Sequence, residues 1–313
     1  PSSDNQTYTA TFTPTGSPTD GQKTISVAAG TFSDTAGNAS SLASNTFTWT
    51  YDGTDPTMGI TATNSSSAVV QSGSRTQDAQ LTLTFTSSES TADFAVGDIT
   101  ATNGALSNFA NPSADNRTYT ATFIPTTDGA VTIDVAAGAF VDAVGNTNTA
   151  APQFTWHYDT TSPSMTISST TVTSGASSNH VSIQLAFASS ESTTNFIASD
   201  ITTTNGAISN FAGSGLNYTA TFTPTADGTS TIKVSANEFT DVAGNDNSLS
   251  NTFTWTQDDT APTMLISATG GGGANVTSGT TTNDAQLNLT FAAIEPTTDF
   301  VVGDITLVGG TLG

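Results

Sequence analysis

Acidic residues are the side chains in this sequence best suited to chemistry, because they recur at four equivalent positions in similar segments of the chain. Oxygen ligands from carboxylates and from Asn carbonyls suit Ca²⁺. Carboxylates that converge from different segments repel one another unless a cation lies between them. We therefore predict calcium sites at which the candidate ligands are Asp52, Asp55, Glu89, Asp142, Asn146, Asp159, Glu191, Asp241, Asn245, Asp258, Asp259 and Glu295.

Turn formation is an alternative role for part of this set. The Asp-x-x-Gly-Asn segments that begin at Asp34, Asp142 and Asp241 are also turn sequences, in which Asp and Asn bond their own backbone and Gly takes a positive φ. Asp98, which precedes an Ile, is similarly suited to capping a turn. The spacing is not that of an EF-hand loop. Both interpretations therefore stay open on the sequence.

Catalytic constellations are weakly supported. The chain has no cysteine and two histidines, His157 and His180, and no Ser–His–acid pattern repeats around either of them. Glu89 and Asp93 could form a glycosidase pair, but equivalents in several similar segments favour a structural role. The run Gly270–Gly273 lacks the Lys and the helix of a phosphate-binding loop. We expect a protein that is not an enzyme.

The charge balance excludes several partners. The sequence has 26 acidic and 4 basic residues and a net charge of −22, so it cannot neutralise the phosphates of a nucleic acid. An anionic membrane surface would also repel it. No apolar run approaches the roughly 18 residues of a membrane span. The chain has no initiating Met and no signal-like segment, which is typical of a processed protein or of a part of a longer one.

Internal repetition organises the whole chain. Trp49, Trp156 and Trp255 stand in three similar segments about 100 residues apart, and three other markers share this period. A unit of that size is a domain rather than a solenoid repeat. The markers divide the chain into a C-terminal half module at 1–52, complete modules at 53–159 and 160–258, and an N-terminal half module at 259–313.

Alternating apolar residues predict strands within each module. In the stretch from Ala79 to Ser87, Leu81, Leu83 and Phe85 share one face and threonines share the other. Seven such short strands, with turn signals between them, predict an immunoglobulin-like β-sandwich. No disulfide is available, so aromatic residues must fill the core. Trp156 is expected there, with a sugar-stacking platform as the alternative.

The strand order also predicts where the acids lie. If the first strand starts at the incoming end of a module, the loop after the second strand, with Glu89, returns to that end. The loop with Asp142 and Asn146 lies at the same end, and the linker with Asp52 and Asp55 arrives there. The sequence therefore predicts that these groups converge.

A family resemblance follows from the combined motifs. The segments LTFTSSESTADFAVGDITATNGALSNF, YTATFIPT and IDVAAGAFVDAVGN resemble the bacterial Ig-like repeat of large surface proteins, and similar copies cover the whole chain. The third copy departs at Asn195, where the others have Asp93 and Asp299, and the last copy has Glu295-Pro296 in place of Glu-Ser. The resemblance implies tandem modules of an adhesin-type protein that is extracellular or on the bacterial cell surface.

The sequence leaves two candidate functions. The first is a structural stalk, fibre or adhesin shaft that Ca²⁺ stiffens at the module junctions and whose partners are neighbouring repeats or subunits. The alternative is a module that binds carbohydrate or a receptor, which should carry loops unlike those of its neighbours. Aligning Tyr8 with Tyr119 and Ile305 with Ile99 makes the two half modules complementary. We expect each half to be completed by the adjoining segment or subunit, because open apolar faces and strand edges favour association.

Overall fold

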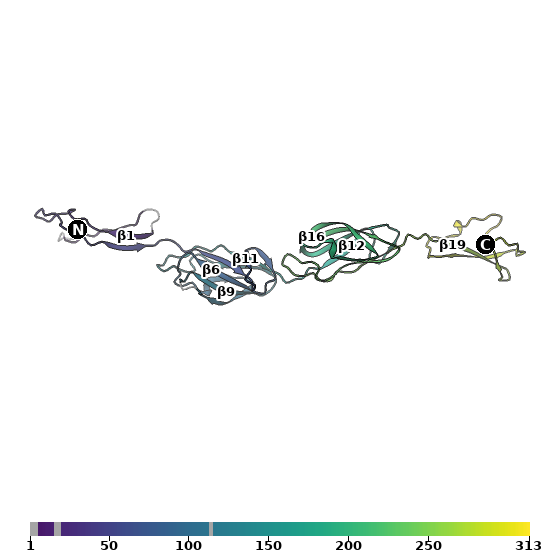
Figure 1. The fold of residues 1–313 in the computed structure, drawn as a ribbon, viewed down its shortest axis with the longest axis horizontal. Coiled ribbons are helices and arrows are strands. Elements are labelled where there is room, and N and C mark those ends of the chain that lie inside the picture. Colours follow the sequence, from purple (N-terminus) through teal and green to yellow (C-terminus); the bar gives the residue numbers. More distant parts are fainter. Residues whose placement is uncertain (1–5, 16–19, 113–114) are drawn as a thin grey trace. The chain divides into compact units, whose positions relative to one another are not determined.

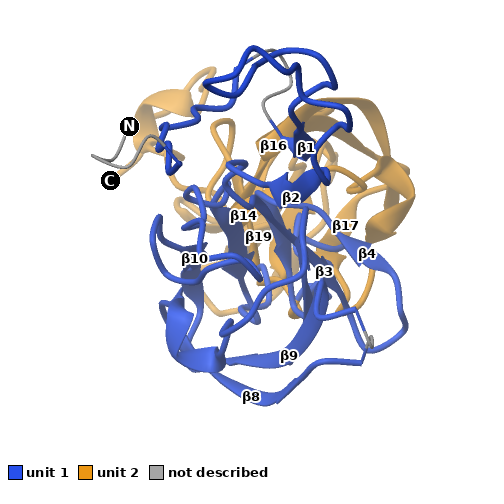
Figure 2. Ribbon diagram, turned by 90° about the vertical axis from the view of Figure 1, so that its left-hand side faces the viewer, with its two compact units in different colours: residues 1–163, 240–247 blue, residues 164–239, 248–313 orange. Residues whose placement is uncertain are grey.

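The computed structural model describes residues 6–15, 20–112 and 115–313. In this part the chain is all-β, with short 3₁₀ turns as its helical elements (Figure 1). The chain forms two compact units, residues 1–163 with 240–247 and residues 164–239 with 248–313 (Figure 2).

The first complete sandwich lies in the first unit and has two sheets. One has the order β4-β3-β6-β9-β8 and the other β5-β11-β10-β7. All pairings are antiparallel except that of β5 with β11. The elements are β3 (Met58–Thr63), β4 (Val69–Val70), β5 (Ser74–Thr76), β6 (Leu81–Ser87), η1 (Val96–Asp98), β7 (Ile99–Ala101), β8 (Gly104–Ala110), β9 (Thr118–Pro125), β10 (Gly129–Val135) and β11 (Phe154–Tyr158).

The alternating apolar residues of β6 face the core of this sandwich. Leu81, Leu83 and Phe85 pair in register with Phe123, Ala121 and Tyr119, and all six are buried. Burying a large apolar side chain contributes about 1.5–3 kcal/mol. Trp156 is 1% exposed, so its expected place in the core is confirmed and the sugar-stacking platform is excluded.

The second complete sandwich lies in the second unit. Its sheets have the orders β12-β14-β16 and β13-β18-β17-β15. It has the same aromatic core, with Trp255 and Phe222 fully buried. The elements are β12 (Met165–Ser169), β13 (Ser177–Ser178), β14 (Ile183–Thr193), η2 (Ala198–Asp200), β15 (Ile201–Thr204), β16 (Gly206–Pro224), β17 (Gly228–Val234) and β18 (Phe253–Gln257).

The apolar pattern from Phe94 to Asn103 predicts one strand, but the structure has the 3₁₀ turn η1 followed by the shorter strand β7 in this stretch. The Asp98 carboxylate accepts a hydrogen bond from the Ala95 backbone N–H at 2.8 Å, and this closes the 3₁₀ turn η1 before β7 begins. The prediction of one long strand is therefore wrong, and the turn-capping role of Asp98 is confirmed. Asp200 and Asp304 cap η2 and η3 in the same way.

Two half modules complete the list of elements. The first, in the first unit, contains β1 (Gly21–Ile25) and β2 (Phe47–Tyr51), while the described residues from Gln6 to Thr15 form no ladder. The second, in the second unit, contains β19 (Met264–Gly270), β20 (Asn275–Val276), β21 (Leu287–Ala293) and η3 (Val302–Asp304). Several apolar side chains of the halves are exposed although their equivalents in the complete sandwiches are buried, among them Phe47, equivalent to Phe154, and Leu289, equivalent to Leu83.

Candidate metal centre

Three carboxylates converge at one end of the first sandwich. Asp52 comes from the incoming linker, Glu89 from the loop after β6, and Asp142 from the loop after β10. One oxygen from each lies within 4.8 Å of the others. An antiparallel bridge between Thr91 and Asp142 joins the two loops. The strand order therefore brings together three of the groups that the sequence places at this end.

Asp142 also organises its own loop. Its Oδ1 accepts hydrogen bonds from the backbone N–H groups of Val144, Gly145 and Asn146 at 2.7–2.9 Å. Its Oδ2 accepts a bond from the Asn146 side-chain amide at 2.8 Å, and Gly145 has φ of 100°. The turn interpretation of Asp-x-x-Gly-Asn is therefore confirmed. It does not exclude cation binding, because each carboxylate oxygen has more than one lone pair.

The electrostatics of the cluster oppose full ionisation. Burial, followed by the negative charges of Asp52, Asp142 and Asp20, raises the pKa of Glu89, although Arg117 acts in the opposite direction. Burial also acts to raise the pKa of Asp142, but the hydrogen bonds from Asn146, Val144 and Gly145 outweigh it, and the net pKa lies below the ordinary value. The folded module thus keeps Asp142 anionic and disfavours the charge on Glu89.

The donor set fits a hard cation. Ca²⁺ takes six to eight oxygen ligands and accepts mono- or bidentate carboxylates. Asp52, Glu89 and Asp142 would supply the carboxylates. The Asn146 side-chain amide nitrogen donates to the backbone oxygen of Asp52 at 3.3 Å, so this residue fastens the linker to the loop. Bound water would complete the coordination.

The corresponding acids of the next junction are Asp159, Glu191 and Asp241. Asp159 and Asp241 belong to the first unit, and Glu191 belongs to the second. Asp241 is buried and accepts hydrogen bonds from the backbone and side chain of Asn245, each at 2.9 Å. The Asn245 amide also donates to the backbone oxygen of Asp159 at 3.0 Å. The buried carboxylate of Asp159 forms an ion pair with Arg75 at 2.8 Å. Glu191 lies near the end of β14, in the second unit.

The other predicted ligands lie apart from such a cluster. Asp55, Asp258 and Asp259 are exposed, and Glu295 is half-buried in a half module. Asp258 accepts a hydrogen bond from the backbone N–H of Thr260. Within the described residues, none of these four belongs to a group of three converging acids.

A further set of acids has a role that the sequence analysis missed. Asp20, Asp128 and Asp227 each stand just before a strand and bind the linker that follows the Trp strand of the same module. Asp128 accepts bonds from the backbone and hydroxyl of Thr160 at 3.0 and 2.9 Å and from the Thr161 hydroxyl at 2.8 Å. The recurring Asp-Gly pair was visible in the sequence, but it indicated only a turn.

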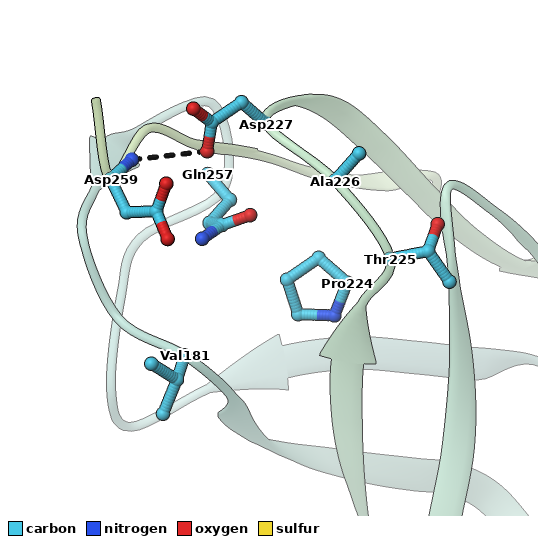
Figure 3. A pocket seen from close by; sticks show the side chains of 7 residues that line it. All are labelled: Val181, Pro224, Thr225, Ala226, Asp227, Gln257 and Asp259. Atoms are coloured by element: carbon cyan, nitrogen blue, oxygen red, sulfur yellow. Dashed lines mark hydrogen bonds between the residues drawn. The ribbon is translucent and has the colours of Figure 1, made fainter.

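The same linker clasp occurs at the other two positions. Asp20 accepts bonds from the Gly53 backbone and the Thr54 hydroxyl. Asp227 accepts a bond from the Asp259 backbone N–H at 3.0 Å (Figure 3). It also accepts a bond from the Thr260 hydroxyl at 2.6 Å. We call these three aspartates, with the linker residues that they bind, the linker clasps.

Ionisation maintains the clasps. The pKa of Asp128 is lowered, mainly by the hydrogen bond from the Thr161 hydroxyl. The pKa of Asp227 is lowered in the same way, mainly by the hydrogen bond from the Thr260 hydroxyl. A depressed pKa in the folded state means that this contribution to stability is present above the unfolded pKa and is lost as the pH falls through the folded pKa. Ionisation of Asp128 and Asp227 therefore favours these two clasps at neutral pH.

Comparison with protein families identifies the sandwich. The model of the bacterial Ig-like domain matches residues 1–51, 52–157 and 159–256. The chain belongs to the bacterial Ig-like domain family. The two complete sandwiches are thus bacterial Ig-like modules in tandem, and the aromatic core occupies the space between their sheets.

Solved structures give distant matches to these bacterial Ig-like modules. FdeC, an Escherichia coli adhesin, has 12% identity and a TM-score of 0.38, with 77% of this chain and 74% of that chain covered. Invasin, a bacterial integrin-binding protein, has 16% identity and a TM-score of 0.36, with 77% and 48% covered. InvE, a Yersinia pseudotuberculosis adhesin, has 14% identity and a TM-score of 0.26, with 66% and 60% covered.

A search of curated proteins finds no match to this sequence. Among the helical elements of the described residues, none has the length and apolar character needed to cross a membrane.

Proposed function

We propose that this chain is a non-enzymatic structural segment of an extracellular or cell-surface bacterial protein, in which tandem Ig-like modules form a stalk, fibre or adhesin shaft. The recurrence of the linker clasp carries this proposal. Three successive linkers are fastened to the preceding module by an aspartate at the equivalent position. A shaft works by length and stiffness, and a clasp that restricts the linker serves both.

Calcium at the module junctions is part of the proposal. The convergence of Asp52, Glu89 and Asp142 supports it, because three carboxylates within 4.8 Å repel unless a cation lies between them. A bound cation would join the incoming linker to two loops of the module. Neighbouring repeats complete the half modules and are the main partners, while any glycan or receptor would be bound through parts of the protein outside this chain.

A panel of glycans and hydrolase substrates tests the functional class. A binding module should carry loops unlike those of its neighbours, yet the two complete modules share the Asp-x-x-Gly-Asn loop and the linker clasp. We expect no glycan bound above background on an array and no turnover of glycoside or peptide substrates. Saturable binding of one glycan, abolished by substitutions in a loop of one module, would contradict the shaft function. It would favour the alternative, a module that binds carbohydrate or a receptor.

A further inference from the structure

The second complete module contains a pocket at the end where the chain leaves it. The pocket has a volume of about 320 Å³ and lies entirely within the second unit (Figure 3). Ligand pockets have volumes of about 300–1,000 Å³, so this one suits a ligand of about the size of one amino acid. The residues that line it include Val181, Pro224, Ala226, Asp227, Gln257 and Asp259.

Gln257 opens this pocket, because the first complete module has a tyrosine at the equivalent position. Gln257 and Tyr158 each end the Trp strand of their module, and each pairs with the glycine that begins the neighbouring strand. The Tyr158 ring packs on Trp156 with a centroid distance of 5.5 Å and adjoins the core of its module. The Gln257 amide is smaller than that ring, so it leaves space between Pro224 and Val181 (Figure 3).

The side-chain amide of Gln257 is buried and has no hydrogen-bond partner in the described part of the chain. Gln257 is 7% exposed, and its amide points into the pocket (Figure 3). A buried polar group without a partner costs free energy, and most buried polar side chains are therefore hydrogen-bonded. This amide thus indicates that the pocket receives a ligand with polar groups.

Two carboxylates line the same pocket. Asp227 belongs to the linker clasp, where each of its two oxygens accepts one hydrogen bond and keeps a further lone pair. Asp259 also lines the pocket, whereas its equivalent in the first complete module is the neutral Thr160 (Figure 3). Two carboxylates that share a site repel one another unless a positive charge lies between them. The pocket is therefore suited to a cationic group.

The equivalent surface of the first complete module is also open. Ala79 and Asp128 correspond to Val181 and Asp227, and both are exposed. They lie in the first unit, which includes residues 240–247 of the following module. The pocket of the second complete module is therefore open because of residues of its own module and linker.

We propose that this pocket binds a guanidinium group, carried either by a small guanidino compound or by an arginine side chain of a partner protein. A guanidinium presents five N–H donors in a planar fork that carboxylates accept in pairs. Asp227 and Asp259 supply the carboxylate oxygens, and the Gln257 carbonyl oxygen accepts a further bond. A guanidinium is more weakly hydrated than an ammonium group, so it suits a pocket with an apolar wall of Val181 and Pro224.

Nuclear magnetic resonance titrations of the whole chain test this site. The probes are agmatine, a small guanidino compound, and N-acetyl-arginine amide, which represents an arginine side chain in a protein. The buffer contains EDTA and about 0.15 M salt, which screens attraction between exposed charges. We expect saturable shifts of the Gln257 side-chain amide and the Val181 methyl signals, and the tighter probe identifies the source of the guanidinium. N-acetyl-citrulline amide, which has the same shape without the charge, should bind at least about tenfold more weakly, and N-acetyl-lysine amide should also bind more weakly.

Two variants and a matched control locate the binding. Asp259→Asn removes one carboxylate from the pocket and should weaken binding of the tighter probe at least about tenfold. Gln257→Tyr should abolish binding and leave the module folded, because Tyr158 stands at this position in the first complete module. Asp258→Asn removes the same charge from the neighbouring exposed residue, which does not line the pocket, and should keep the affinity within about twofold.

Several results would overturn the guanidinium site. They are the absence of saturable shifts with both probes, equal binding of the citrulline or lysine compound, and equal loss of affinity in Asp258→Asn and Asp259→Asn. Displacement of agmatine by millimolar Ca²⁺ in excess over EDTA would assign the pocket to a metal ion instead. The site goes beyond the shaft function, and none of these results bears on the glycan panel or on inter-module stiffness, so its failure is distinguishable from failure of that function.

Discussion

Replacing Trp156 with alanine should lower the free energy of unfolding of the first complete module by about 3–5 kcal/mol, as truncation of a buried aromatic side chain does. Trp156 is 1% exposed and packs edge-to-face on Phe123. Its indole N–H also bonds Thr76, so the mutation leaves the threonine hydroxyl without this donor. The total free energy of unfolding of a small domain is about 5–15 kcal/mol, so the expected loss is a large part of the module's stability.

Thermal unfolding of the whole chain measures this effect. A loss of 1 kcal/mol lowers the melting temperature of a module of this size by about 4–8 °C. We therefore expect one transition to fall by more than about 10 °C in the Trp156→Ala protein. Trp255→Ala should move the transition of the other complete module, and Thr155→Ala, on the opposite face of β11, should change little. A Trp156→Ala transition within a degree or two of the parental one would contradict the buried position of Trp156.

Calcium should stabilise the first complete module by about 1.4–2.7 kcal/mol at concentrations 10 to 100 times the dissociation constant. Extracellular modules typically bind Ca²⁺ with dissociation constants of about 10⁻⁴–10⁻³ M, so millimolar Ca²⁺ is required. The stabilisation arises because the cation binds Asp52, Glu89 and Asp142 together only in the folded state. The measurement is the melting temperature in Ca²⁺ and in excess EDTA.

Glu89→Gln separates cation binding from simple charge repulsion. Two charges 4 Å apart interact by about 1 kcal/mol in water, so removing one charge should stabilise the metal-free module by an amount of this order. Because the folded-state pKa of Glu89 is raised, this gain is present at neutral pH and disappears as the pH falls below the unfolded pKa. The variant should lose its response to Ca²⁺. Identical melting of the parent in Ca²⁺ and EDTA would refute the calcium site.

The strands were predictable because the sequence alternates strictly. Leu81, Leu83 and Phe85 alternate with threonines, and this pattern fixes which face of β6 is buried. The segment after Phe94 was not predictable in the same way, because a hydrogen bond from the Ala95 backbone to Asp98 converts part of it into a 3₁₀ turn. The two-residue strand β4 and the three-residue strand β5 are too short for a periodic signal.

The grouping of acids was predictable only in part. Up-and-down strand order was enough to place Asp52, Glu89 and Asp142 at one end of the module. The partner of Asp159 was not visible, because Arg75 reaches it through the parallel pairing of β5 with β11, which joins residues far apart in the sequence. The role of Asp128 was missed because its acceptor function depends on the path of a linker that follows two strands later.

Inter-module stiffness tests the shaft function most directly. Spin labels at Ser107→Cys and Ser209→Cys, which are exposed and lie one in each complete module, report the distribution of distances between the modules. The shaft function predicts a narrow distribution in Ca²⁺ that broadens in EDTA, and a broader one for Asp128→Ala, which releases the clasp on the intervening linker. A distribution that is equally broad in Ca²⁺, in EDTA and in the Asp128→Ala protein would contradict a stiffened shaft.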